Sequence, residues 1–195
     1  MTPLISIVVP LYNEEKVFGK LIGRLKELMD SVAPSIEVVL VDDGSVDGTS
    51  RLIQETALSD DRFKAVLLSR NYGHQIAVSA GMSQVSGQDA VMIIDGDLQD
   101  PPELLMIFYQ KIKEGYDVVY AIRGKRKEGP LKRMLYWCFY RFLRMISEVN
   151  IPLDSGDFCM ISRRVNDIMV SMPEQSRFIR GMRTWVGFNQ IGIPY

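Results

Sequence analysis

A short acidic stretch, Asp95-Gly96-Asp97-Leu98-Gln99, carries the residue types best suited to chemistry in this chain. If the stretch is an extended strand exit, Asp95, Asp97 and Gln99 face the same side, because side chains alternate along a strand. Closely spaced carboxylate and amide oxygens are hard ligands that Mg²⁺ or Mn²⁺ prefers, with water and phosphate oxygens completing the shell. A solvated acidic turn is the alternative, although Asp100 already supplies a cap for the next helix. The stretch predicts a divalent-metal site because it follows an apolar strand.

A second acidic cluster, Asp42-Asp43-Gly44-Ser45, ends another apolar run and is followed by Asp47. Its carboxylates are able to accept hydrogen bonds from a nucleobase N–H or from ribose hydroxyls. A turn with a helix cap accounts for Gly44, Ser45 and Asp47. It does not account for two adjacent carboxylates at the end of a strand, and these indicate a nucleotide site.

A basic segment precedes an amphipathic helix expected over 130–147. Its cations fall within eleven residues and are opposed only by Glu128: Arg123, Lys125, Arg126, Lys127, Lys132 and Arg133. On a helical wheel, the 130–147 helix has one apolar face and one basic and aromatic face. Such a helix suits a membrane interface. An ordinary helix docked on the core, with a solvated basic face, fits equally well, and a phosphate-bearing acceptor would also use these cations.

The elements that position these residues alternate between strand and helix in the first half of the chain. Apolar β-branched runs predict strands over 5–10, 36–41, 63–68, 90–94 and 117–122. Helical spacing and caps predict helices over 13–29, 47–58 and 75–85, with another starting at 100. This order predicts an α/β fold with a mostly parallel sheet and helices on both faces. Ligands bind beyond the carboxyl ends of such strands, where both acidic clusters lie.

The composition is that of an ordinary globular domain, with 195 residues, 47% of them hydrophobic and 24% charged. The net charge of −1 gives no argument for binding nucleic acid. We expect one domain, 1–195, that is cytoplasmic and soluble or membrane-peripheral, because no leader or apolar run of about 20 residues is present. Since Ile191-Gly192-Ile193-Pro194-Tyr195 resembles the middle of a strand or loop, we also expect a truncated chain.

The motifs of several other enzyme classes are absent from this sequence. The chain has no G-x-G-x-x-G after the first strand and no G-x-x-x-x-G-K-[ST], which argues against dinucleotide oxidoreductases and P-loop enzymes. Its two cysteines have no metal-ligand spacing, and no Ser-His-Asp or Cys-His arrangement can be argued. The only histidine, His74, is expected in a loop with a structural or ligand-rim role.

Taken together, the motifs resemble the family 2 glycosyltransferases. The resemblance rests first on Val8-Val9-Pro10-Leu11-Tyr12-Asn13-Glu14-Glu15, Val41-Asp42-Asp43-Gly44-Ser45 and Asp95-Gly96-Asp97-Leu98-Gln99-Asp100-Pro101-Pro102-Glu103. Residues 69–74, 154–158, 177–181 and 185–188 are similar to the polyprenyl-phosphate subgroup, which includes dolichyl-phosphate mannose synthase and bactoprenol glucosyltransferases. The resemblance spans nearly the whole chain. It implies a GT-A (nucleotide-diphospho-sugar transferase) fold.

The resemblance also implies inverting, metal-dependent transfer from a nucleotide-sugar, preferably a UDP-sugar, to a polyprenyl phosphate. The reaction would take place at the cytoplasmic face of the membrane. Residues implied to line the nucleotide pocket are Pro10, Tyr12, Glu14, Asp42 and Asp43. Asp95 would face the donor as a second catalytic and nucleotide-binding group, and Asp97 with Gln99 would hold Mg²⁺ or Mn²⁺ on the diphosphate.

The acceptor side follows from the same resemblance. Asp157 matches the position proposed as catalytic base, and Arg123 and Lys125 would meet phosphates of the acceptor or donor. Arg177 and Arg180 would belong to a mobile segment that closes on the diphosphate. This chain departs from the pattern at Cys159, where family members often carry arginine after Gly-Asp-Phe. The departure removes one candidate phosphate contact.

Two alternatives stay open from the sequence. One is a glycosyltransferase acting on a glycolipid or polysaccharide, although no Gln-x-x-Arg-Trp motif of processive polymer synthases is recognisable. The other is a catalytically silent nucleotide-sugar binding module, against which the intact Asp95 and Asp97 argue. Proteins of this subgroup usually continue into transmembrane helices, and the sequence also leaves a homo-oligomer open.

Overall fold

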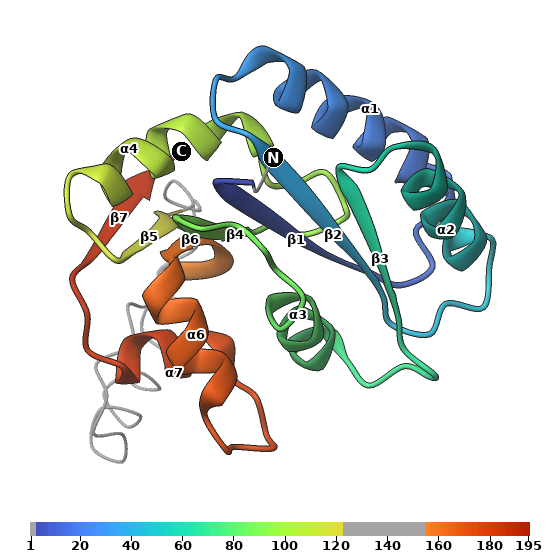
Figure 1. Cartoon of the computed structure of the whole chain (residues 1–195). Coiled ribbons are helices and arrows are strands. Elements are labelled where there is room, and N and C mark those ends of the chain that lie inside the picture. Colours follow the sequence, from blue (N-terminus) through green and yellow to red (C-terminus); the bar gives the residue numbers. More distant parts are fainter. Residues whose placement is uncertain (1–2, 123–154) are drawn as a thin grey trace, which may run out of the picture.

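The computed structural model describes residues 3–122 and 155–195 and shows a seven-stranded sheet in the order β3-β2-β1-β4-β6-β5-β7 (Figure 1). The strands are β1 (Ile5–Leu11), β2 (Ile36–Asp42), β3 (Phe63–Leu67), β4 (Ala90–Ile93), β5 (Val118–Ile122), β6 (Ser155–Ser162) and β7 (Gln190–Pro194). The helices are α1 (Glu15–Ser31), α2 (Thr49–Ser59), α3 (His74–Met82), the 3₁₀ turn η1 (Pro102–Leu104), α4 (Leu105–Lys113), α6 (Arg163–Ser171) and α7 (Ile179–Trp185).

The sheet is mostly parallel, as the alternation of strands and helices predicts. Strands β1 to β4 run parallel to their neighbours among themselves, and β7 runs parallel to β5. Strand β6 is inserted between β4 and β5 and runs antiparallel to both. Every residue of β1 and β2 is buried, which is typical of strands covered on both faces. The predicted α/β architecture is confirmed.

Helices cover both faces of the sheet, with α1, α2 and α4 on one side and α3, α6 and α7 on the other (Figure 1). Alternate residues of β1 serve the two layers, so that Ile7 and Val9 pack toward α1 and Val8 packs toward α3. A Cβ added at Gly81 of α3 would lie 2.4 Å from Cγ1 of Val8. The missing side chain therefore lets α3 lie close against the sheet.

The chain changes direction across the sheet at β1. It builds β2 and β3 on one side of β1 and then returns to add β4 on the other side. A crevice forms at such a switch point, beyond the carboxyl ends of the strands. Because β6 is antiparallel, its beginning reaches the same edge at which β4 ends. The register pairs Ile93 with Cys159, and continuing it by two residues sets Asp95 opposite Asp157.

The start of the fourth helical segment differs from the sequence prediction. The η1 turn begins at Pro102 without a side-chain cap, and α4 follows only at Leu105. Asp100, which was expected to cap the helix, is instead buried, and its Oδ2 accepts a hydrogen bond from the Asp95 N–H at 3.3 Å. Its carboxylate thus serves the acidic stretch and not the helix.

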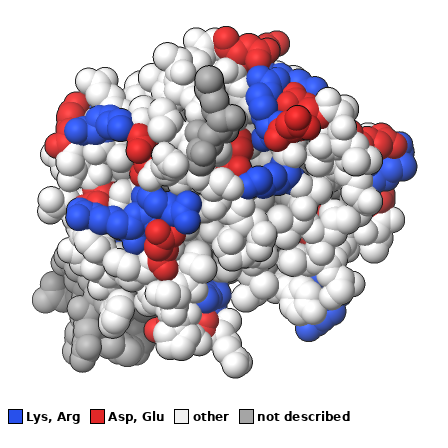
Figure 2. Space-filling model, in the orientation of Figure 1, with Lys and Arg blue, Asp and Glu red and all other residues white. Residues whose placement is uncertain are grey.

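Some predictions concern residues that the structure does not describe. The 130–147 helix, Arg123 and Lys125 all lie outside the described residues. Within residues 3–122 and 155–195, no helix is long and apolar enough to span a membrane. On the face shown in Figure 2, basic and acidic side chains of the described residues are interspersed, in keeping with a net charge of −1.

Candidate active site

A pocket of about 330 Å³ lies at the switch point beyond the ends of β1 and β4. It is lined by Pro10, Leu11, Tyr12, Glu14, Asp43, Asn71, Gly73, His74, Ala77, Asp95, Gly96 and Asp97. Six of the residues predicted from the sequence are therefore brought together: Pro10, Tyr12, Glu14, Asp43, Asp95 and Asp97. The lining does not include Asp42, Gln99, Asp157, Arg177 or Arg180.

The loops after β1 and β2 are joined by hydrogen bonds at the edge of the pocket. Ser45 Oγ accepts a hydrogen bond from the Asn13 N–H at 2.9 Å, and Asn13 Oδ1 accepts one from the Val46 N–H at 2.9 Å. Asp47 accepts from the N–H groups of Thr49 and Glu15, at the starts of α2 and α1. These exchanges hold the Tyr12–Glu14 segment in place, with Asn13 at a φ of 56°.

The adjacent carboxylates Asp42 and Asp43 are both buried but make different contacts. Asp42 Oδ1 accepts a hydrogen bond from the Ser45 N–H at 3.0 Å and shapes the turn. Asp43 uses both oxygens to accept hydrogen bonds from the N–H groups of Tyr72 and Gly73, at 2.7 and 2.9 Å. Only Asp43 lines the pocket, where it fixes the loop that leads into α3. A nucleotide contact for either carboxylate stays a prediction.

The acidic stretch is a turn, so the expectation of an extended strand exit is wrong. Strand β4 ends at Ile93, and Leu98 has a φ of 65°. A Cβ at Gly96 would lie 2.4 Å from Cδ2 of Leu11, so the turn packs tightly on the end of β1. Asp97 is exposed and lines the pocket, and its Oδ1 accepts the Gln99 N–H at 3.0 Å.

The pocket carboxylates fit a divalent ion that takes most of its ligands from substrate and water. Glu14, Asp95 and Asp97 line the same pocket, and Asp95 Oδ1 is a buried acceptor without a hydrogen bond. Burial first, and the carboxylates of Asp97 and Asp47 next, raise the pKa of Glu14. Among the described residues, no three His, Cys, Asp or Glu side chains form a ready cage for a metal. Diphosphate oxygens would have to complete the shell.

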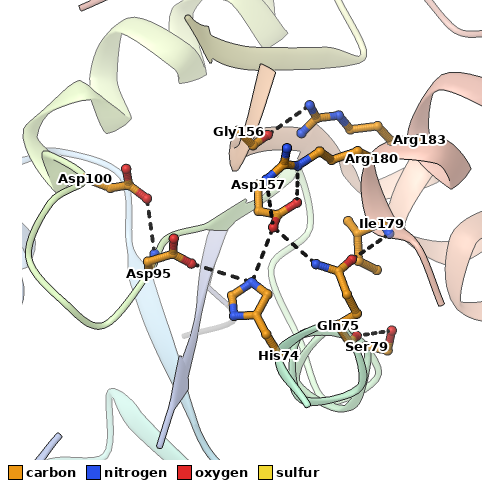
Figure 3. Close-up of polar contacts among 10 residues, drawn as sticks. All are labelled: His74, Gln75, Ser79, Asp95, Asp100, Gly156, Asp157, Ile179, Arg180 and Arg183. Atoms are coloured by element: carbon orange, nitrogen blue, oxygen red, sulfur yellow. Dashed lines mark hydrogen bonds and ion pairs between the residues drawn. The ribbon is translucent and has the colours of Figure 1, made fainter. Parts of the chain in front are cut away.

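His74 lies between two carboxylates on the floor of the site (Figure 3). Its Nε2 is 3.6 Å from Oδ1 of Asp95 and 3.5 Å from Oδ2 of Asp157, distances of ion pairs rather than of short hydrogen bonds. Contact with Asp157 raises the pKa of His74, although burial opposes the shift. Burial also raises the pKa of Asp95, while His74 opposes that change.

Asp157 is the most strongly held carboxylate of the site. Arg180 Nε donates to its Oδ1 at 2.8 Å, and Gln75 Nε2 donates to its Oδ2 at 3.1 Å. Gln75 Oε1 in turn accepts the N–H of Ile179 at 2.8 Å, so this amide joins α7 to β6. Burial disfavours the Asp157 carboxylate, but the contact with His74 and the hydrogen bond from Arg180 outweigh it and hold its pKa far below the usual range.

Sequence reasoning gave His74 a structural or ligand-rim role but missed its contacts with the two carboxylates, and it gave Gln75 no role. His74 was expected in a loop but is the first residue of α3, and it faces both Asp95 and Asp157. A signal was present for His74, because it ends the subgroup-like motif at 69–74, whereas Gln75 lies just beyond that motif. The antiparallel register of β6, which brings Asp157 to this point, could not be read from the residues.

Arg177 and Arg180 belong to the same segment but do different things. Arg177 donates to the carbonyls of Met169 and Met172, at 2.7 and 2.9 Å, and so closes the end of α6. The structure does not bring it to the pocket. Cys159 is fully buried on β6, and Arg183 of α7 lies close enough to its thiol to counteract the rise that burial causes in the thiol pKa. A guanidinium therefore lies near position 159 despite the missing arginine there.

The pocket between β1 and β4, with its facing carboxylates, agrees with a family comparison. Residues 6–168 match the model of Glycosyl transferase family 2. The chain belongs to this family. The predicted family and the GT-A fold are both confirmed.

Individual relatives support the same assignment. The chain is 47% identical over 191 residues to the uncharacterized glycosyltransferase YkcC of Bacillus subtilis (strain 168), covering 97% of this chain and 59% of the relative. It is 37% identical over 192 residues to the bactoprenol glucosyl transferase of Shigella phage SfV, covering 98% and 62%. The chain thus spans about 60% of the length of these curated relatives.

A solved structure shows the same fold at low sequence identity. The mannosyltransferase PcManGT from Pyrobaculum calidifontis, in complex with GDP-Man and Mn²⁺, has a TM-score of 0.66 and 18% identity. The match covers 100% of this chain and 55% of that chain.

Proposed function

We propose that this family 2 glycosyltransferase transfers a sugar from a nucleotide-sugar, with UDP as the preferred nucleotide, to a polyprenyl phosphate. One observation carries the proposal: the β4–β6 register sets Asp157 opposite Asp95, which lines the pocket together with Asp97, and His74 lies between the two carboxylates. The bactoprenol glucosyl transferase at 37% identity supports a polyprenyl-phosphate acceptor. We infer that the reaction occurs at the membrane, because the acceptor is a lipid, and we propose the cytoplasmic face.

The donor side follows from the charges around the pocket. Glu14, Asp95 and Asp97 place negative charge where a diphosphate, itself an anion, has to bind. A bound Mg²⁺ or Mn²⁺ would neutralise both and act as a Lewis acid on the leaving diphosphate. Asp97, as the exposed pocket carboxylate, would hold the ion, and Asp95 would support the donor from beneath. The mannosyltransferase from Pyrobaculum calidifontis, which has the same fold and was solved with GDP-Man and Mn²⁺, supports a divalent ion at the nucleotide-sugar.

The acceptor side favours a nucleophile that is already ionised. Because the pKa of Asp157 lies far below its usual range, this carboxylate is a weak proton acceptor. A sugar hydroxyl would need a stronger base, whereas a phosphate monoester carries negative charge near neutral pH. We therefore assign to Asp157 the positioning of the acceptor and of Arg180, with inversion at the anomeric carbon following from in-line attack opposite the diphosphate.

A transfer assay with the purified chain tests the proposal. Labelled UDP-glucose and undecaprenyl phosphate are incubated in detergent with Mn²⁺, with Mg²⁺ or with EDTA, and the lipid product is extracted. We expect labelled lipid with either metal and none with EDTA. Other nucleotide-sugars are tested in the same way, after a thermal-shift screen in which a ligand at about 100 times its dissociation constant stabilises by about 2.7 kcal/mol.

Acceptor competition separates this function from the alternatives. Equal transfer to a neutral glycolipid or to a polysaccharide would contradict the polyprenyl-phosphate assignment. Binding of a nucleotide-sugar without transfer to any acceptor would instead favour the silent binding module. Transfer that is unaffected by EDTA would contradict the metal dependence while leaving the acceptor assignment in place.

A further inference from the structure

Arg183 is an almost fully buried cation in the layer formed by α3, α6 and α7. It lies on α7, and 1% of its surface is exposed. Nη2 donates to the carbonyl of Gly156 at 3.1 Å. Nε and Nη1 are also buried, but neither has a hydrogen-bond partner in the part of the chain that the structure describes. Two of its three nitrogens thus lack the contacts that buried guanidinium groups ordinarily make.

Within residues 3–122 and 155–195, no carboxylate forms a salt bridge or hydrogen bond with the Arg183 guanidinium. The guanidinium lies 5.5 Å from the centre of the Tyr120 ring, which offers only a cation–π contact. The Cys159 thiol beside it is fully buried, and burial raises its pKa, so it stays neutral. The carboxylate of Asp157 follows Gly156 in the chain, but its oxygens already bind Arg180 and Gln75. A buried charge without a partner is strongly unfavourable, and it calls for an anion.

We propose that Arg183 binds oxygen atoms of the phosphate group of the acceptor. This inference rests on the function proposed above. Arg180 and Arg183 lie three residues apart on α7, and both guanidinium groups reach β6 at Gly156 and Asp157 (Figure 3). Two guanidinium groups against one carboxylate leave a net positive charge there. The fixed fork of N–H donors on an arginine suits two phosphate oxygens.

The position of Arg183 points to the acceptor rather than to the donor. Asp97, the candidate metal ligand, lines the pocket, whereas neither Arg180 nor Arg183 does. His74 lies between Asp95 and Asp157 and so separates the pocket from the two arginines (Figure 3). A phosphate held beside Asp157 approaches the sugar from the side opposite the diphosphate, as inversion requires.

Binding at Arg183 requires α7 to move locally, because the guanidinium is covered. The helix is joined to its neighbours by Arg183 with Gly156, Arg180 with Asp157 and the Ile179 N–H with Gln75. An acceptor phosphate would compete for both arginines at once and exchange their present contacts for its own. We therefore expect undecaprenyl phosphate in detergent to change the amide hydrogen exchange of residues 179–185.

The substitutions Arg183→Met and Arg183→Lys test the inference. With Arg183→Met, KM for undecaprenyl phosphate should rise about tenfold to a hundredfold, the effect of losing a charged hydrogen bond, while KM for the nucleotide-sugar stays unchanged. The melting temperature should stay equal or rise, because an unpaired buried charge is removed. Arg183→Lys should recover part of the acceptor affinity, since it keeps the charge without the fork.

Arg51→Met is the matched control, because Arg51 is exposed on α2 and pairs with the exposed Glu55 four residues further along the same helix. It removes the same charge and should leave both KM values unchanged. A lower melting temperature for Arg183→Met, with kcat and both KM values all impaired, would make Arg183 structural and overturn the inference. A selective rise in KM for the nucleotide-sugar would assign the arginine to the donor diphosphate and also overturn it.

Sugar transfer by the parent chain separates a failure of this inference from a failure of the proposed function. If the parent chain binds nucleotide-sugar and glycosylates the lipid, and Arg183→Met does so with an unchanged KM, only the role of Arg183 is wrong. If the parent chain itself transfers no sugar to any polyprenyl phosphate, the proposed function fails, and the inference fails with it.

Discussion

The two walls of the site hold their carboxylates in different ways. We name these walls for the ligands proposed above. The donor wall consists of the loops after β1 and β2 and the turn at 95–99, and there Asp42, Asp43 and Asp47 accept hydrogen bonds from backbone N–H groups. The acceptor wall consists of Asp157 on β6 with Arg180 and Arg183 on α7. There, charged side chains bind one another.

This difference implies different roles for the two walls. Backbone donors are fixed by the fold, so we expect the donor wall to keep its shape when a ligand binds. The contacts of the acceptor wall involve long side chains, and an incoming anion is able to compete for them. We therefore expect substitutions in the donor wall to affect catalysis through the metal and nucleotide, and substitutions in the acceptor wall to affect acceptor use.

The largest expected effect is that of Asp97→Asn in the donor wall. Asp97 is exposed and lines the pocket, so it is the carboxylate best placed to hold an ion on the diphosphate. Its loss should lower kcat/KM for transfer by about 10²- to 10³-fold, the usual effect of removing one group that stabilises charge in the transition state. Steady-state kinetics over a range of Mn²⁺ concentrations measures this.

The matched control for this change is Asp61→Asn, an exposed carboxylate in the turn before β3. It should retain the rate of the parent chain. Equal activity of Asp97→Asn and the parent at low Mn²⁺ would remove Asp97 from the metal site.

A smaller effect is expected for Gln75→Leu in the acceptor wall. Gln75 joins Asp157 to the Ile179 N–H, so its loss releases the start of α7 and one side of the carboxylate. The substitution removes one hydrogen bond to a carboxylate and one between uncharged groups, and we expect this loss to lower kcat about tenfold. Nucleotide-sugar affinity, measured by thermal shift, should not change.

Gln84→Leu provides the comparison for Gln75→Leu, because Gln84 is exposed just after the end of α3. A Gln75→Leu variant with normal kcat but weakened nucleotide-sugar binding would assign Gln75 to the donor wall. It would contradict the separate roles proposed for the two walls.

The donor wall was largely predictable from the sequence, because its chemistry lies at the ends of locally readable strands. Asp43, Asp95 and Asp97 were found from their places after apolar runs, and the structure sets all three around one pocket. The local geometry was less predictable. Asp100 resembled a helix cap but supports Asp95, since a backbone N–H needed a partner in the buried turn.

The acceptor wall was predictable only through family resemblance. The residues alone do not show that β6 inserts antiparallel between β4 and β5, and this pairing across more than sixty residues of sequence is what brings Asp157 to Asp95. The resemblance gave roles to Asp157 and Arg180 but none to His74, Gln75 or Arg183. Their contacts depend on how α3 and α7 pack against β6, which no local pattern encodes.

The pH dependence of stability should show how strongly the two carboxylates that flank His74 stabilise its protonated form. The pKa of His74 is raised in the folded protein by Asp157 and Asp95, against the opposing effects of burial and of Arg180. Its contribution to stability is therefore fully present below the unfolded pKa of about 6.5 and is lost as the pH rises through the folded pKa. His74→Gln should lower the melting temperature by a few degrees near pH 5.5 and by less near pH 8.5.

Thermal unfolding of the parent chain and His74→Gln in parallel buffers measures this difference. Adding Asp157→Asn to both proteins should reduce the pH dependence, because Asp157 makes the largest contribution to the shift. A gap that widens toward high pH would mean that His74 is buried in its neutral form and that the ion pairs do not form.

The smallest effect is expected when an arginine–carboxylate pair is removed from the surface beside the donor wall. Arg24 of α1 binds both oxygens of Glu103, but the Glu103 side chain is 59% exposed, whereas that of Asp157, paired with Arg180, is 11% exposed. Because water solvates an exposed carboxylate that loses its partner, Arg24→Met should cost at most about 1 kcal/mol, or about 2–4 °C in melting temperature. Arg180→Met removes the cation that pairs with the buried Asp157 carboxylate, so it should lower the free energy of unfolding by more than Arg24→Met does. Equal decreases in melting temperature for Arg24→Met and Arg180→Met would show that the exposure of the carboxylate does not determine the effect of losing its arginine.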